Sequence, residues 1–515
     1  MNAFDCCVRS KDYIDDSTNP KKSTTSSLPS SPPTFQSVNM TNQNQTQKEK
    51  ASTFARQCEL SRLPIPTLDE TLTAFQSTLE PLLTATEYTK AKRDIQTFRT
   101  NESQGPKLHS LLLEYEEQNV SSQTVGSYIE EFWSEAYLSP NTSVVLNLNP
   151  YFLLENDPNL VKQSQIPRAA SLCFNSLKFA HSVKNETLTP ETFKSNPICM
   201  DQFRSLLGST RIPKLDEADV VEVDPHSTHV AVLYRHEFYF FTALWPHDHP
   251  SHPNAVAVSE AEIAHILKSI VQDGKQQTPL HHDTATTTSS SSSSPSALGV
   301  LTTLPRMQWA RARENLASSS AHNKTTLEIL DSALFCLVLD DYIPSTVHHA
   351  AANLLHGTTE LKVNAELGVE YQVGTCCNRW YDKLQLIVCG DGSAGVNFEH
   401  SAIDGHTALR FASDVFAETL VSFAKSITKS IYPKGECPIS NVLESTVVLA
   451  SFMEEHHGGG LDTNPKKLTW DDVPGIQDQI YHAETKLGDS ISADDTHVLE
   501  FEDFGKNLIV RNKMR

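Results

Sequence analysis

Residues 384–416 constrain the fold more than any other part of this 515-residue chain. Residues 384–389 are a run of strand-forming side chains, and we predict a second strand over residues 395–399. Between them lies Gly390-Asp391-Gly392, whose Asp and Gly residues supply the backbone conformations that tight hairpin turns need. Apolar side chains then recur every three to four residues over 409–416, a spacing typical of a helix. We therefore predict a β-hairpin that leads into a helix.

His400 lies at the end of the second predicted strand and begins the pattern His-x-x-x-Asp-Gly, completed by Asp404 and Gly405. A histidine projecting from a strand end can act as a general base, since its ordinary pKa near 6.5 lets it accept a proton at neutral pH. The chain contains 21 histidines, so this spacing also arises by chance. A structural role for His400 is the alternative interpretation.

Other segments show helix or strand patterns that indicate a mixed α/β fold. We predict helices over residues 68–82, 260–271, 309–316 and 327–339, and a hairpin over residues 230–244 with its turn at Arg235-His236-Glu237. Two polar stretches lack such patterns: residues 1–56, rich in Ser, Thr, Asn, Gln and Pro, and the Ser/Thr run at 284–296. We expect a disordered tail over 1–56 and a disordered insertion near 273–298.

The net charge narrows the possible partners. Lys and Arg number 42 against 63 Asp and Glu, a net charge of −21, so the overall field repels nucleic acid. An anionic ligand must find a local basic pocket. No apolar run approaches the length of a membrane helix, so we expect no membrane span.

The cysteines and histidines point to an intracellular protein without a metal site. Ten cysteines include no Cys-x-x-Cys pair, which favours reduced thiols in the cytosol. Asp5, Asp15 and Asp16 make the first residues unlike an arginine-rich mitochondrial presequence. We predict a cytoplasmic location, with the mitochondrion and the peroxisome as alternatives.

The histidines at 247–252 and 281–283 lie in polar loops without a partner cluster, so we expect no metal.

The surroundings of His400 resemble a known family. Asn397-Phe398-Glu399-His400-Ser401, with Gly374-Thr375 and residues 378–385 upstream, resembles the central signature of the carnitine/choline acyltransferases. Further matches occur in the order of the family: Leu63-Pro64-Ile65-Pro66, Asp201-Gln202-Phe203-Arg204, residues 208–213, Trp309-Ala310 with Arg313, Leu334-Phe335 and Leu339-Asp340-Asp341. The resemblance extends from about residue 57 to the end and is strongest to the carnitine O-acetyltransferase branch.

The resemblance implies two domains, each similar to chloramphenicol acetyltransferase, in a mixed α/β fold. Residues 57–138 would form a helical region that contributes to the second domain, and residues 139–440 would form the domain with the catalytic histidine. Residues 441–515 would begin the second domain, which binds coenzyme A and the acceptor. We expect that domain to be incomplete in this chain.

The resemblance also implies a reaction: reversible transfer of a short acyl group between coenzyme A and carnitine. His400 would be the general base and Asp404 a supporting residue that holds the loop. Lys506 and Lys513 would face the phosphates of coenzyme A, which acts as a co-substrate, with no tightly bound cofactor. The partners would be acyl-CoA and carnitine, and the protein would be a monomer.

The last residues depart from the family pattern. Val510 stands where the next lysine is expected, and the residues that bind carnitine and the oxyanion in the family have no counterpart before Arg515. This leaves three alternatives open. The chain could be a choline acetyltransferase, a carnitine acyltransferase for medium or long acyl chains, or a truncated, non-catalytic interaction partner.

Overall fold

The computed structural model describes residues 52–100, 102–122, 126–276, 297–363, 370–431, 460–500 and 505–511. Most of the predicted tail (1–51) and of the predicted insertion (277–296) lie outside the described residues. At the edges of these two segments the chain is packed. Thr53 is fully buried and donates its hydroxyl to the Leu188 carbonyl at 2.7 Å, and Leu298 is also fully buried.

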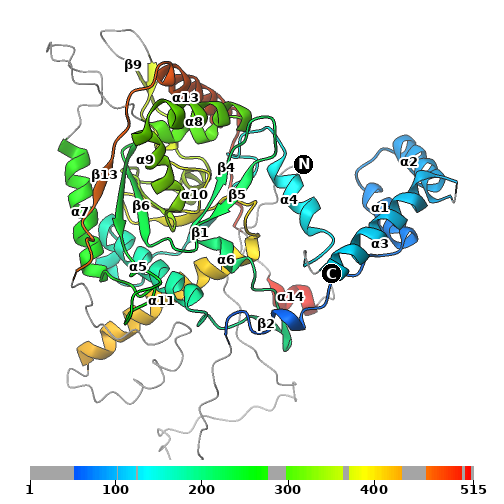
Figure 1. The fold of residues 1–515 in the computed structure, drawn as a ribbon, viewed down its shortest axis with the longest axis horizontal. Helices are drawn as coiled ribbons and strands as arrows, with labels where there is room; N and C mark the ends of the chain where they lie inside the picture. Colours follow the sequence, from blue (N-terminus) through cyan, green and yellow to red (C-terminus); the bar gives the residue numbers. More distant parts are fainter. Residues whose placement is uncertain are drawn as a thin grey trace, which may run out of the picture.

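A seven-stranded mixed sheet forms the centre of the protein (Figure 1). Its strands, in spatial order, are β1 (Tyr151–Leu154), β12 (Ala394–Asn397), β11 (Gln385–Val388), β8 (Cys336–Leu339), β6 (His229–Tyr234), β7 (Glu237–Thr242) and β13 (Lys466–Leu468). The pairs β11/β8 and β8/β6 are parallel, and the other pairs are antiparallel. Smaller hairpins join β2 (Thr192–Phe193) to β3 (Asn196–Pro197), β4 (Ser209–Ile212) to β5 (Val220–Val223), and β9 (Leu361–Val363) to β10 (Glu370–Gln372).

Helices occupy much of the rest of the described chain. They are α1 (Leu68–Leu79), α2 (Ala85–Arg99), α3 (Gln104–Ser122), α4 (Glu130–Leu138), α5 (Gln165–Lys184), α6 (Phe203–Leu206), α7 (Glu260–Gln276), α8 (Arg306–Ser319), α9 (Ala321–Ser332), α10 (Val347–Leu355), α11 (Gly405–Ile431), α13 (Ile476–Ala493) and α14 (Lys506–Arg511). Short 3-10 helices are η1 (Gln57–Glu59), η2 (Leu160–Lys162), η3 (Leu298–Thr303) and η4 (Thr375–Cys377). The predicted mixed α/β architecture is thus confirmed.

The sheet has a hydrophobic core on each face, because successive side chains of a strand point to opposite faces. On β6, Val230 and Val232 belong to one core, whereas Ala231 and Leu233 belong to the other. The first core is covered by α5, α7 and α11, and the second by η3, α8, α9 and α13. Strands buried on both faces read as continuous apolar runs, as the central strands of this sheet do.

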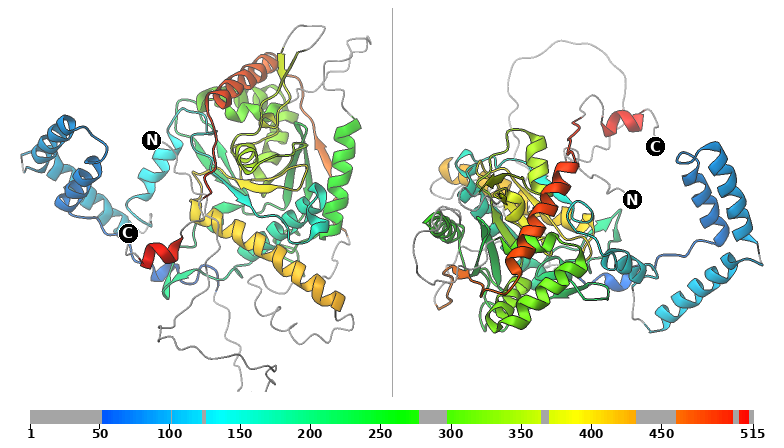
Figure 2. Two further views of the ribbon diagram at one scale, coloured as in Figure 1. Left: turned by 180° about the vertical axis from the view of Figure 1, so that it is seen from behind. Right: turned by 90° about the horizontal axis from the view of Figure 1, so that it is seen from above.

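Helices α1 to α3 pack on one another and extend away from the sheet (Figure 2). The starts of the first two are fixed locally. The Thr67 and Thr84 side chains each accept a hydrogen bond from the backbone N–H three residues later. The side chains of Glu70 and Glu87 in turn accept a hydrogen bond from the backbone N–H of Thr67 and Thr84. These reciprocal bonds satisfy N–H groups that the first helical turn leaves unpaired.

Both predicted hairpins are present. The β6–β7 turn consists of Arg235 and His236, which have φ values of 50° and 70°, while Glu237 already belongs to β7. The β11–β12 turn contains Gly392 with φ of 88°. A Cβ atom on Gly392 would lie 1.9 Å from the Gln163 carbonyl oxygen, so the turn requires glycine.

The predicted helix over 327–339 is wrong in its second half. Helix α9 ends at Ser332, and Cys336–Leu339 form β8 in the middle of the sheet. All four residues of β8 are buried. A short run that is apolar at every position shows neither the alternation of a strand nor the spacing of a helix, so its sequence pattern fits both. Among the helices of the described ranges, none is long and apolar enough to cross a membrane.

Candidate active site

His400 lies in the loop between β12 and α11, as the hairpin pattern predicts. Its ring is half-buried and packs edge-on against Tyr137, with ring centroids 5.0 Å apart, and against Phe398 at 5.8 Å. Trp133, on the same helix as Tyr137, has its ring centroid 6.4 Å from that of His400. Helix α4, distant in sequence, therefore covers one side of the histidine with aromatic rings.

This environment keeps His400 neutral. Burial lowers the pKa of His400 below its usual 6.5, and the negative charges of Glu399 and Asp404 oppose that shift without cancelling it. A neutral imidazole at pH 7 has a free nitrogen lone pair. His400 is therefore in the protonation state that a general base requires.

The residue before His400 is held by buried charge pairs. Glu399 Oε1 accepts a hydrogen bond from Arg211 Nη1 at 3.0 Å, and both side chains are almost completely buried. Glu399 Oε2 accepts hydrogen bonds from the backbone N–H of Ser401, at 3.0 Å, and from its hydroxyl. The Glu399 carboxylate thus bonds to Arg211 and Ser401, and it holds the backbone of the residues directly before and after His400.

Arg211 connects this loop to residues of other elements. Its Nη2 donates to the Tyr137 carbonyl at 2.9 Å, so the same guanidinium holds the helix that covers His400. Its Nε donates to Asp219 at 2.7 Å, and Asp219 also accepts from Arg306. Arg306 in turn donates to Asp382 at 2.8 Å, and every ionic side chain in this network is buried.

Asp404 caps the helix that follows His400. Its Oδ1 accepts the backbone N–H of Thr407 at 3.0 Å, in the first turn of α11. The Gln202 side-chain oxygen accepts both the Asp404 N–H and the Thr407 hydroxyl, each at 2.8 Å. Asp404 therefore fixes the geometry of the His400 loop by capping, and it adds a negative charge near the imidazole.

The structure brings two of the four predicted site residues together: His400 and Asp404 share one loop. Lys506 begins α14, and Lys513 lies outside the described residues. The sequence patterns alone assign no role to Gln202, Arg211 or Tyr137. Gln202 and Arg211 lie within family-like motifs that could have suggested a role, whereas no signal links Tyr137 to His400.

Known proteins resemble this chain along most of its length. A family model for choline/carnitine O-acyltransferases matches residues 63–515. A Saccharomyces cerevisiae protein to which a mitochondrial carnitine O-acetyltransferase activity is ascribed is 33% identical over 472 residues, which are 87% of this chain and 65% of that protein. Human mitochondrial carnitine O-palmitoyltransferase 2 is 28% identical over 91% of this chain and 65% of its own length. Rat carnitine O-acetyltransferase is 26% identical, with coverages of 89% and 64%. The chain thus spans just under two thirds of the length of these relatives.

Proposed function

This chain belongs to the choline/carnitine O-acyltransferase family, and from that premise we propose that it transfers a short acyl group reversibly between coenzyme A and carnitine. The observation that carries the proposal is the environment of His400. It is a half-buried imidazole whose pKa is lowered by burial, and its neighbours Glu399 and Asp404 hold its loop through hydrogen bonds.

In the proposed reaction, His400 removes the proton from the carnitine hydroxyl while that oxygen attacks the thioester carbonyl carbon of acyl-CoA. The carbon–sulfur bond then breaks, the thiolate of coenzyme A leaves, and the imidazolium returns the proton to the sulfur. The reverse reaction uses the same groups in the opposite order. His400 acts as base and then as acid, so no acyl-enzyme is formed.

The remaining residues have supporting roles. Asp404 positions the loop, and we propose that Lys506 and Lys513 attract the phosphates of coenzyme A, which serves as a co-substrate with no tightly bound cofactor. A Lys506→Gln variant tests this role: it should raise the KM for acetyl-CoA several-fold and leave kcat nearly unchanged. An unchanged KM would remove Lys506 from the binding site.

The finer structural and cellular expectations belong to the same proposal. We propose that the seven-stranded sheet and its helices form the first of two chloramphenicol-acetyltransferase-like domains, and that helices α1 to α4 contribute to the second. We also propose a monomer in the cytoplasm. The name of the yeast relative includes a mitochondrial location, so fractionation of the native cells decides between the two compartments.

An acceptor comparison tests the proposed substrate. Release of free coenzyme A from acetyl-CoA, catalysed by the native protein purified from its own cells, is measured with carnitine and with choline at equal concentrations, and then with palmitoyl-CoA and carnitine. We expect turnover with acetyl-CoA and carnitine to exceed the other two combinations by at least tenfold. Preference for choline or for palmitoyl-CoA would support the corresponding alternative enzyme. No transfer in any combination would support a non-catalytic interaction partner.

A further inference from the structure

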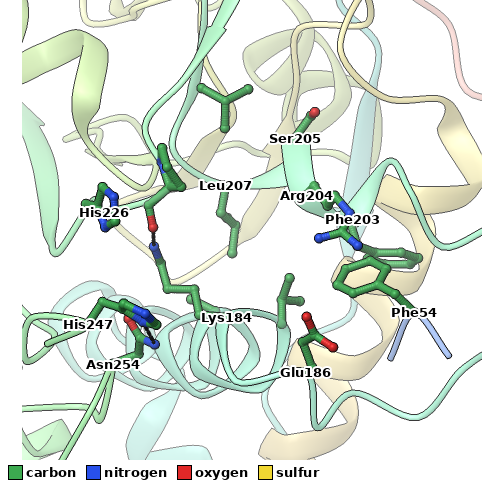
Figure 3. A pocket seen from close by; sticks show the side chains of 14 residues that line it. Phe54, Lys184, Glu186, Phe203, Arg204, Ser205, Leu207, His226, His247 and Asn254 are labelled. Atoms are coloured by element: carbon green, nitrogen blue, oxygen red, sulfur yellow. Dashed lines mark hydrogen bonds between the residues drawn. The ribbon is translucent and has the colours of Figure 1, made fainter. Parts of the chain in front are cut away.

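A cavity that His400 does not line lies next to the carboxyl end of α5 (Figure 3). Its volume is about 470 Å³, within the range of small-molecule sites. Helix α6 contributes to its wall, and so do the segment around Phe54 and the loops that contain His226 and His247. His400, Glu399 and Asp404 do not line it.

Two cationic side chains of this cavity come from different elements. Lys184 ends α5, and its Nζ donates to the Pro225 carbonyl at 2.6 Å, which uses one of the three hydrogens of the ammonium group. Arg204 in α6 stacks its guanidinium on the Phe54 ring at 3.5 Å, and its Nε bonds to Asp201 at 3.2 Å. Its two terminal amino groups are donors with which it can bind an anion in a forked arrangement.

His247 and Asn254 also line the cavity. The Asn254 side-chain amide nitrogen lies 3.2 Å from His247 Nδ1. Among the lining residues within the described ranges, Glu186 is the one carboxylate, and it accepts a hydrogen bond from the Ser52 hydroxyl.

Apolar side chains form the rest of the wall. Val183, Leu207 and Val223 line the cavity, together with the ring of Phe54. An inorganic anion alone would leave these side chains against water. A ligand with an anionic head and a short apolar body would contact both parts of the wall.

We propose that this cavity binds a small organic anion, with its carboxylate or phosphate head between Lys184 and Arg204 and its apolar body against Leu207 and Val223. The net charge of −21 repels anions from the protein as a whole. Lys184 and Arg204 supply the local positive charge that such a ligand needs, although Arg204 is ion-paired with Asp201 and Lys184 interacts with the charge of Asp224. The proposal does not depend on the acyltransferase reaction.

Isothermal titration of the 515-residue chain tests the proposal. The probes are hexanoate and hexyl phosphate, which distinguish the two head groups, and hexanol as the neutral control. We expect saturable binding of at least one anion with one site per chain, and no binding of hexanol. Lys184→Gln and Arg204→Gln should each weaken the binding at least tenfold, because each removes a charge-assisted contact. Lys184→Arg keeps the positive charge and should retain most of the wild-type affinity for the anion.

Two control variants distinguish binding in this cavity from non-specific attraction to surface lysines and from binding near His400. Lys324→Gln removes an exposed lysine of α9 and should leave the affinity unchanged. His400→Ala should also bind the anion as the wild type does, whether or not the acyltransferase proposal is correct. The proposal is overturned if neither anion binds, if hexanol binds equally well, if the Lys184 and Arg204 variants retain wild-type affinity, or if His400→Ala abolishes binding.

Discussion

Arg211 Nη1 lies 3.0 Å from Glu399 Oε1, so a buried ion pair holds the residue directly before His400. The same guanidinium donates to the Tyr137 carbonyl on α4. One buried arginine therefore fixes both the loop that carries the histidine and the helix that covers it. This arrangement places the half-buried imidazole, which lies in a loop between a strand and a helix, next to the aromatic rings of α4.

Removing the Glu399 carboxylate should destabilise the protein strongly. Glu399→Ala takes one of two acidic partners from Arg211, and breaking a buried pair costs about 3 kcal/mol of the free energy of unfolding. Glu399→Gln keeps a hydrogen-bond acceptor and should cost less. Urea unfolding measures both. As a control, Glu328→Ala removes an exposed partner of Lys324 and should cost less than about 1 kcal/mol. Equal losses for Glu399→Ala and Glu328→Ala would show that the buried network contributes little.

The capping role of Asp404 predicts different results for two substitutions. Asp404→Ala loses the acceptor for the Thr407 N–H and should lower the free energy of unfolding by about 1 kcal/mol. Asp404→Asn keeps an acceptor oxygen and should stay near the wild type. Urea unfolding tests stability, and initial rates of acetyl transfer test activity. If Asp404→Asn is stable but loses activity as fully as Asp404→Ala, the charge of Asp404 matters to the reaction beyond capping.

The covering helix should control the pH dependence of the reaction. Because the pKa of His400 lies below 6.5, kcat/KM for acetyl transfer should fall on the acid side of that pH and be independent of this group above it. Tyr137→Ala lets water reach the imidazole, so the pKa should rise toward 6.5 and the acid limb should move to higher pH. Glu135→Ala, on the exposed face of α4, is the control. If the acid limb of the kcat/KM profile of Tyr137→Ala stays at the wild-type pH, Tyr137 does not lower the pKa of His400 by covering it.

His236 predicts a loss of stability in mild acid. Burial lowers the pKa of His236 to about 4, against an ordinary value near 6.5, so the unfolded chain binds a proton that the folded protein does not. The stability due to this difference is present above pH 6.5 and is lost as the pH falls from 6.5 toward 4. The loss from His236 between pH 7 and pH 5 should be about 2 kcal/mol.

The variant His236→Asn isolates this contribution. Asparagine tolerates the positive φ of this turn and does not titrate between pH 7 and pH 5. Its free energy of unfolding should therefore fall less between these pH values than that of the wild type. His265→Asn, at an exposed position of α7, should follow the wild type. Parallel pH profiles for wild type and His236→Asn would contradict the assignment.

The sequence predicts local structure better than it predicts the surroundings of His400. The hairpin before His400 and the helical stretch over residues 409–416 follow from patterns a few residues long, and the structure confirms both. The contact between Tyr137 and His400 joins segments far apart in the chain, which no local period reveals. The pattern at β8 favours a helix for a related reason, since burial on both faces removes the alternation that marks a strand. The partners of Arg211 likewise depend on the tertiary fold.

The central claim is that His400 is the general base of an acyl transfer from coenzyme A to carnitine. The most direct test uses the full-length native protein and compares wild type, His400→Ala and the exposed-histidine control His265→Ala for acetyl transfer to carnitine, with matched circular dichroism and unfolding curves. We predict that His400→Ala lowers the rate about 10²–10⁴-fold while His265→Ala does not, since that is the contribution of a general base. A folded His400→Ala protein within a few-fold of the wild-type rate would contradict the account.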